Sequence, residues 1–200
     1  MTFGPTIPGE TPIDDVSELK IKGLTLRREL NEYEARNVLK AVVKYLSRTP
    51  SRRLAPFDLT WVKKLHKEMF GDVWGWAGRL RTTDLTIGID PAHVETSLYD
   101  LVESLRTQPL SADYTLLDQA VWLHHRAVQI HPFPNGNGRW SRLLSNVWLK
   151  QHGSPIVAWP EEAVGESSPV RGEYLDAIRK ADDFDLEPLT ELHRRFLETQ

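Results

Sequence analysis

The residues best suited to chemistry in this 200-residue chain form one continuous run, His131-Pro132-Phe133-Pro134-Asn135-Gly136-Asn137-Gly138-Arg139-Trp140-Ser141-Arg142. His131 is the one side chain of this run that can accept a proton near neutral pH. Gly136 and Gly138 lack a Cβ, so the backbone N–H groups around them can approach an anion closely. We expect these N–H groups at the start of a helix, where unpaired donors and the helix dipole favour phosphate.

Charged and amide side chains complete the expected anion site. Arg139 and Arg142 are three residues apart, so they share one helix face and can direct two guanidinium groups at the same anion. Asn135 offers an amide oxygen to a hard cation, and Asn137 offers a further oxygen and N–H groups. A phosphate-binding turn, a metal ligand and a base in so short a run indicate phosphoryl or nucleotidyl transfer, which needs mainly positioning and charge neutralisation.

Each of these features also has a simpler explanation. A Gly-Asn-Gly turn is common before helices, two helix arginines usually form a solvated face, and His131 with Pro132 could merely end a loop. Together, however, the residues meet every specified position of the pattern His-Pro-Phe-x-Asp/Asn-Gly-Asn-Gly-Arg-x-x-Arg. The run therefore resembles the signature of the Fic (Fido) domain family.

The resemblance implies a protein nucleotidyltransferase (an AMPylator) that transfers AMP from ATP to a Ser, Thr or Tyr hydroxyl of a target protein. It implies that His131 is the general base, that Asn135 is a Mg²⁺ ligand and that Phe133 anchors the loop in the core. The nucleotide-binding roles, in the anion-binding turn and at the distal phosphates, fall to Gly136, Asn137, Gly138, Arg139 and Arg142. The neutral oxygen of Asn135 is a weaker magnesium ligand than the aspartate that other members carry.

Two further segments carry the resemblance, which extends from about Thr25 onward. Residues 73–81, VWGWAGRLR, are similar to the segment that precedes the target-docking flap in Fic proteins. The segment LTLRRELNEYEARN (24–37) and the order of helices resemble the subfamily called mobile mystery protein B. Phosphorylating relatives depart from Gly-Asn-Gly-Arg, so the intact pattern favours nucleotidyl transfer. The alternatives are a Fic-fold transferase of another phosphate-linked group and a catalytically silent partner in a toxin–antitoxin-like pair.

Many Fic proteins carry a regulatory helix with the pattern Ser/Thr-x-x-x-Glu-Gly/Asn, whose glutamate pairs with the last arginine of the motif. Thr25 to Glu29 fits its first five positions, but Leu30 stands where Gly or Asn is expected. The resemblance thus implies Thr25 and Glu29 as inhibitory residues, with Glu29 paired to Arg142. The competing interpretation is that Thr25 and Glu29 cap the first helix.

The surrounding pattern predicts an all-α protein with one short β-hairpin near residues 80–90, and the resemblance implies that this is a Fic-type helical bundle with the hairpin as its flap. Residues 1–24 are rich in Pro, Gly and Thr and are expected to be an extended or loosely ordered lead-in, followed by a single Fic domain over 25–200. Helices are expected from Arg27, after Asp58, after Asp90-Pro91, from Thr115 to Ile130, and over 137–150, 169–181 and 188–198. The first helix is expected to bury Leu30, Tyr33, Val38, Leu39, Val42 and Leu46.

Composition narrows the class of protein further. The chain has no cysteine, which excludes disulfides, thiolate nucleophiles and Cys-ligated zinc, and its net charge of −3 argues against a general nucleic-acid binder. Without an apolar run of spanning length or a signal-like start, we expect a cytoplasmic domain with no membrane partner. The family resemblance implies a bacterial protein. Its expected partners are a hydroxyl-bearing target protein and an antitoxin-like protein. His66 and His193 lie in amphipathic patterns without evident partners, and His124 is interpreted as a core histidine.

Overall fold

The computed structural model describes residues 16–24, 26–107, 110–111, 114–160 and 169–198, so most of the predicted lead-in and Thr25 lie outside the described residues. The helices are α1 (Arg27–Leu46), α2 (Leu59–Phe70), η1 (Pro91–His93), α3 (Val94–Thr107), α4 (Leu116–Ile130), α5 (Asn137–Gln151), α6 (Pro169–Asp182) and α7 (Glu187–Arg195). Extended pairing in the described part is confined to isolated bridges, such as that between Leu19 and Trp74. The predicted all-α class is confirmed.

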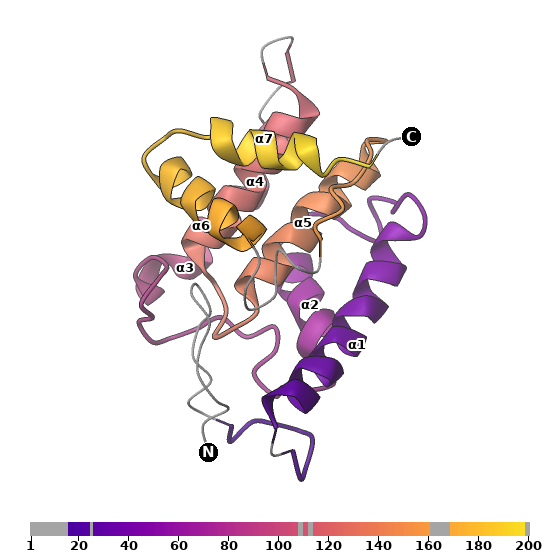
Figure 1. The fold of residues 1–200 in the computed structure, drawn as a ribbon, viewed down its shortest axis with the longest axis vertical. Helices are drawn as coiled ribbons and strands as arrows, with labels where there is room; N and C mark the ends of the chain where they lie inside the picture. The colour runs from indigo at the N-terminus through magenta and orange to yellow at the C-terminus, as the bar shows by residue number, and fades with distance from the viewer. Residues whose placement is uncertain (1–15, 25, 108–109, 112–113, 161–168, 199–200) are drawn as a thin grey trace.

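Helices α4 and α5 pack against each other in the middle of the molecule, between α1 with α2 on one side and α6 with α7 on the other (Figure 1). Helix α5 contacts α1 and α2, whereas α4 contacts α3, α6 and α7. The loop that joins α4 to α5 is therefore reached from both sides of the bundle. None of the helices in the described ranges is long and apolar enough to cross a membrane.

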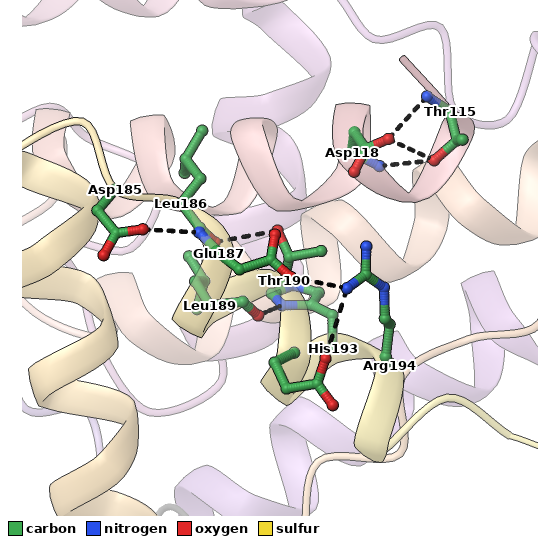
Figure 2. A network of polar contacts seen from close by, with 10 residues as sticks. Thr115, Asp118, Asp185, Leu186, Glu187, Leu189, Thr190, His193 and Arg194 are labelled. Carbon is green, nitrogen blue, oxygen red and sulfur yellow. Dashed lines mark hydrogen bonds and ion pairs between the residues drawn. The ribbon is translucent and has the colours of Figure 1, made fainter. Parts of the chain in front are cut away.

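The predicted helix starts are set by local side-chain caps. Asp58 Oδ1 accepts a hydrogen bond from Trp61 N at 2.7 Å. At the start of α4, Thr115 N donates to Asp118 Oδ2 at 2.8 Å and Asp118 N donates to Thr115 Oγ1 at 3.3 Å, a reciprocal capping box (Figure 2). Such caps satisfy backbone donors that the first turn leaves unpaired. These starts are confirmed because they depend only on neighbouring residues.

The buried face of α1 differs from the predicted stripe. Tyr33 and Leu39 were expected inside but are 41% and 59% exposed. Two polar residues, Glu34 and Asn37, are buried instead. Asn37 holds α2 to the following turn, because its Nδ2 donates to Glu68 O at 2.9 Å and its Oδ1 accepts from Asp72 N at 2.8 Å. The helix is rotated relative to the hydrophobic pattern because its inner face makes polar contacts with the rest of the domain.

The segment near residues 80–90 is irregular, with bends at residues 83 and 86–89, and does not form the predicted hairpin. Its two arms are joined by the guanidinium group of Arg81, which donates to Thr83 O at 3.0 Å and also to Ile89 O. An arginine side chain thus takes the place of the expected backbone ladder. Residues 80–90 are called the flap.

Candidate active site

The motif occupies the loop between α4 and α5. Helix α4 ends at His131, which has left-handed backbone angles (φ 51°, ψ 60°) and donates its N–H to Ala127 O at 3.2 Å. Pro132 and Pro134 cannot donate to a continuing helix, so the chain turns. Helix α5 then begins at Asn137, directly after Gly136. The predicted base and the predicted anion-binding turn are therefore placed at the two ends of one short loop.

His131 is held in the proton-accepting form. The side chain is buried, with 6% of its surface exposed, and Nδ1 lies 3.3 Å from Val128 O. A carbonyl can only accept, so Nδ1 carries the proton and Nε2 carries the lone pair. Burial lowers the pKa of His131 to about 4, and the positive charge of Arg81 adds to this effect, while the hydrogen bond to Val128 opposes it. His131 is consequently neutral at physiological pH, as a general base must be.

Asn137 closes the loop through its side chain. Its Oδ1 accepts from Phe133 N at 2.9 Å, and its Nδ2 donates to Phe133 O at 2.8 Å. Phe133 itself is fully buried, in agreement with its expected anchoring position. The amide group of Asn137 is thus used within the protein, and its contribution to anion binding is left to the backbone at the start of α5.

His66 of α2 contacts the same loop, although no partner for it was predicted from the sequence. Gly78 N donates to His66 Nδ1 at 3.0 Å, which leaves Nε2 as the donor to Asn135 O, also at 3.0 Å. The imidazole stacks on Phe133 with ring centroids 3.7 Å apart. Burial lowers the pKa of His66 to about 3, so the ring stays neutral. The interpretation of His66 as an unpartnered histidine was wrong.

The two glycines of the turn have different surroundings. Gly136 has a positive φ of 78°, and a Cβ there would lie 2.6 Å from Phe70 Cζ. At Gly138 the nearest atom to an added Cβ is Arg142 Nη1, at 3.8 Å. Gly136 is therefore required by the fold itself. Gly138 instead presents the first turn of α5 beside a guanidinium group, as an anion-binding helix N-terminus requires.

The two motif arginines are held by different helices. Arg139 Nη1 pairs with Glu34 Oε2 of α1 at 2.7 Å, and its guanidinium lies 4.7 Å from the Phe70 ring centroid. Glu34 also accepts from Trp74 Nε1 at 2.6 Å, so it is fixed at both oxygens. Arg142 lies over the Tyr174 ring of α6, 5.6 Å from its centroid. Arg142 thus lies beside Gly138 of the anion-binding turn, whereas Arg139 is held by Glu34 and Phe70.

The predicted pair between Glu29 and Arg142 is not present in the described structure. Glu29 Oε2 accepts from Leu26 N at 3.4 Å in a solvent-exposed contact at the start of α1, as expected of a helix-start residue. Arg142 contacts Tyr174 instead. The glutamate of α1 that reaches the motif is Glu34, about one and a half turns further along, because that is where α1 crosses α5.

The flap lies directly against the base. Arg81 N donates to Pro132 O at 2.9 Å, and Arg81 Nε donates to His131 O at 2.7 Å. A Cβ at Gly88 would lie 2.7 Å from His131 Cβ. Sequence reasoning did not single out Arg81, whose one signal was its place in the VWGWAGRLR segment. Arg81 joins the flap and the catalytic loop into one unit.

Asn135, the predicted magnesium ligand, turns its Oδ1 toward Gly136 N at 2.6 Å. An amide oxygen can accept two bonds, so this contact does not exclude a metal ion. Magnesium is commonly bound by one or two protein ligands together with substrate phosphates. In the described ranges no group of three His, Cys, Asp or Glu side chains forms a metal cage. A single amide ligand beside an anion-binding turn fits a magnesium ion that arrives with a nucleotide.

Comparison with known proteins relates this geometry to the Fic/DOC family. Residues 56–149 match the model of the Fic/DOC family. The curated protein adenylyltransferase fic-1 of Caenorhabditis elegans is 32% identical over 133 residues, 64% of this chain and 24% of that protein. The chain thus spans about a quarter of the length of this relative.

Solved structures share the fold. A structure of Fic-1 from C. elegans has a TM-score of 0.67 and 25% identity, covering 88% of this chain and 50% of that one. The N-terminal Fic domain of a Bartonella quintana effector, a structure with bound ADP, has a TM-score of 0.64 and 18% identity, covering 90% of this chain and 89% of that one. This chain therefore shares the fold of these Fic domains, and its residues 56–149, which contain the motif, match the Fic/DOC family model.

Proposed function

We propose that this domain is a protein adenylyltransferase, which transfers AMP from ATP to a Ser, Thr or Tyr hydroxyl of a target protein. One observation carries the proposal. A buried His131 in its proton-accepting form and a helix N-terminus with Arg142 beside Gly138 are joined by a single loop. The similarity to curated adenylyltransferases and to a Fic domain with bound ADP supports it.

In the proposed reaction the target hydroxyl attacks the α-phosphate and pyrophosphate leaves. His131 Nε2 takes the hydroxyl proton as the new O–P bond forms. The backbone of Gly136 to Gly138 holds the phosphates at the α5 N-terminus, and Arg139 and Arg142 neutralise charge on the leaving pyrophosphate. Mg²⁺, held by Asn135 together with the phosphates, would supply further neutralisation of that charge. The flap, fixed by Arg81, would align the target chain beside His131.

Finer assignments belong to the same proposal. The segment 24–37 supports membership of the mobile mystery protein B subfamily, and with it a bacterial, cytoplasmic protein that acts beside an antitoxin-like partner. Regulation by an α1 glutamate is assigned to Glu34 in preference to Glu29, because Glu34 is the one in contact with a motif arginine.

Intact-mass spectrometry tests the proposed reaction. The purified chain, with a cell lysate as a source of targets, is incubated with Mg²⁺ and ATP, GTP, CTP or UTP in turn. The proposal predicts adducts with the mass of AMP, formed with ATP. Adducts with the mass of a phosphate, or of another nucleotide, would show a Fic-fold transferase of a different group. A chain that binds ATP and forms no adduct would be the silent partner of a toxin–antitoxin-like pair.

A further inference from the structure

A line of buried polar contacts crosses the molecule behind the active site, from α7 through α4 to α6. His193 Nδ1 lies 2.8 Å from Leu189 O (Figure 2). His193 Nε2 lies 3.1 Å from His124 Nδ1, and His124 Nε2 lies 3.0 Å from the Tyr174 hydroxyl. The line ends at Tyr174, whose ring centroid lies 5.6 Å from the guanidinium carbon of Arg142 and whose hydroxyl interacts electrostatically with that group. Three helices thus supply consecutive members of one chain of hydrogen bonds.

The direction of every proton in this chain follows from its far end. Leu189 O can only accept, so His193 Nδ1 carries a proton and, in a neutral ring, Nε2 does not. His193 Nε2 must then accept from His124 Nδ1, which leaves His124 Nε2 as an acceptor. Tyr174 therefore donates its hydroxyl proton to His124. The hydroxyl proton of Tyr174 is thus directed away from Arg142, and the oxygen keeps its lone pairs for that cation.

Burial keeps this order fixed. His124 and His193 are completely buried, and Trp159 packs edge-on against both rings, with centroids 5.5 and 4.9 Å away. Burial lowers the pKa of His193 to about 4 and that of His124 well below its ordinary value. Burial also lowers the pKa of Arg142 and raises that of Tyr174, while the electrostatic attraction between the two groups opposes both shifts. The imidazoles are thus neutral, and Arg142 gains an acceptor.

We propose that His193, His124 and Tyr174 form a directional hydrogen-bond relay that positions Arg142 beside Gly138 for nucleotide phosphate. These three are positioning residues, because they act through Arg142 and do not reach the anion-binding turn themselves. The inference rests on the proposed function in one respect, that Arg142 binds phosphate. The existence and direction of the relay do not depend on it.

The relay predicts a specific effect of replacing His193, the residue at its far end. In His193→Phe the His124 Nδ1 proton has no acceptor, so the ring is expected to move its proton to Nε2 and donate to Tyr174. The Tyr174 hydroxyl proton then turns toward Arg142 and repels it. The substitution of His193, which does not contact Arg142, thereby changes the position of the Arg142 guanidinium. His193→Gln, which keeps an acceptor oxygen near the Nε2 position, is expected to preserve the order.

The tautomers can be measured directly and independently of activity. Long-range ¹H–¹⁵N correlation spectra of the full chain distinguish protonated Nδ1 from protonated Nε2. The relay predicts Nδ1–H for both His193 and His124, and a change of His124 to Nε2–H in His193→Phe. An Nε2–H tautomer at either histidine of the parent protein would overturn the relay, whether or not the chain transfers AMP.

Binding of ATP with Mg²⁺, measured by calorimetry, tests the link to Arg142. A hydrogen bond to a charged group typically contributes enough that His193→Phe and Tyr174→Phe should each weaken binding about tenfold. The double variant should be no weaker than Tyr174→Phe alone, because the relay acts only through Tyr174. His125→Gln is the matched control: it alters a neighbouring buried histidine of α4 that contacts Asp182, outside the relay, and should leave binding unchanged.

The outcomes separate the relay from the proposed function. Additive losses in the double variant, or equal losses in His125→Gln and His193→Phe, would show general destabilisation of the α4–α6–α7 packing and overturn the relay. Rescue by His193→Gln supports it. If the parent chain does not bind ATP, the proposed function fails, and the tautomer spectra still decide whether the relay exists.

Discussion

Replacement of Glu34 by glutamine tests whether α1 restrains the nucleotide site. Glu34 Oε2 pairs with Arg139 Nη1 at 2.7 Å, and the carboxylate is 5% exposed, so solvent screens the pair only weakly. Polyphosphate must compete with this carboxylate for Arg139. Charge-assisted hydrogen bonds of this kind contribute about 1.5–3 kcal/mol. Glutamine keeps an oxygen that can accept from Trp74 Nε1, so the variant removes the charge and retains the packing.

We expect Glu34→Gln to bind ATP with Mg²⁺ at least about tenfold more tightly, since that is the lower end of the energy released from the pair. Isothermal titration calorimetry measures the affinity, and thermal melts check that the fold is kept. Glu29→Gln is the matched control on the same helix, because its exposed contact with Leu26 lies away from the motif. Unchanged or weaker ATP binding in Glu34→Gln would refute the reasoning. It would leave Glu34 as a residue that only orients Arg139.

Three further predictions concern the loop and its histidines. Gly136→Ala should destabilise the fold by more than about 1 kcal/mol, because Gly136 has a positive φ and lies close to Phe70. Gly138→Ala should keep the stability, and Gly138→Val should lose ATP binding. Equal melting temperatures for the two alanine variants would contradict this prediction. With His131 neutral down to a pKa of about 4, kcat/KM of the folded enzyme should fall on the acid side near pH 4, and a midpoint near the ordinary value of about 6.5 would exclude His131 as the titrating base. Burial lowers the pKa of four histidines, His66, His124, His131 and His193, so below about pH 6.5 the unfolded chain binds more protons than the folded chain. The free energy of unfolding, measured with urea, should therefore decrease from pH 7 to pH 5 by about 1 kcal/mol per pH unit for each of these histidines. Equal stability at the two pH values would contradict the assignment of neutral rings.

Features encoded by neighbouring residues could be predicted from the sequence. The caps at Asp58 and Thr115 depend on contacts within a few positions, and the turn at Gly136 is indicated by the glycine itself, whose φ is 78°. The motif could be identified for the same reason, because its base and anion-binding turn lie in one loop. The helical class followed from these starts and from the apolar periods between them.

Features that depend on distant partners could not be predicted. His66 contacts Asn135, 69 positions away, and Arg81 contacts His131, 50 positions away. Glu34 interrupts the apolar pattern of α1 because its buried carboxylate pairs with Arg139 of the motif. Glu29, five residues earlier in the same helix, matches the family's regulatory pattern more closely, but it contacts Leu26 at the helix start and not the motif. Only the packing of α1 on α5 decides which glutamate meets an arginine.

The central claim is that the loop with His131 transfers AMP, and label transfer from ATP tests it most directly. The chain is incubated with a lysate and with ATP labelled at either the α- or the γ-phosphate, and His131→Ala serves as the comparison after its ATP binding has been measured. We predict that protein is labelled from α-labelled ATP alone, and that His131→Ala binds ATP yet transfers roughly 10²–10⁴-fold less label. Label from the γ-phosphate, or equal transfer by His131→Ala, would contradict the account.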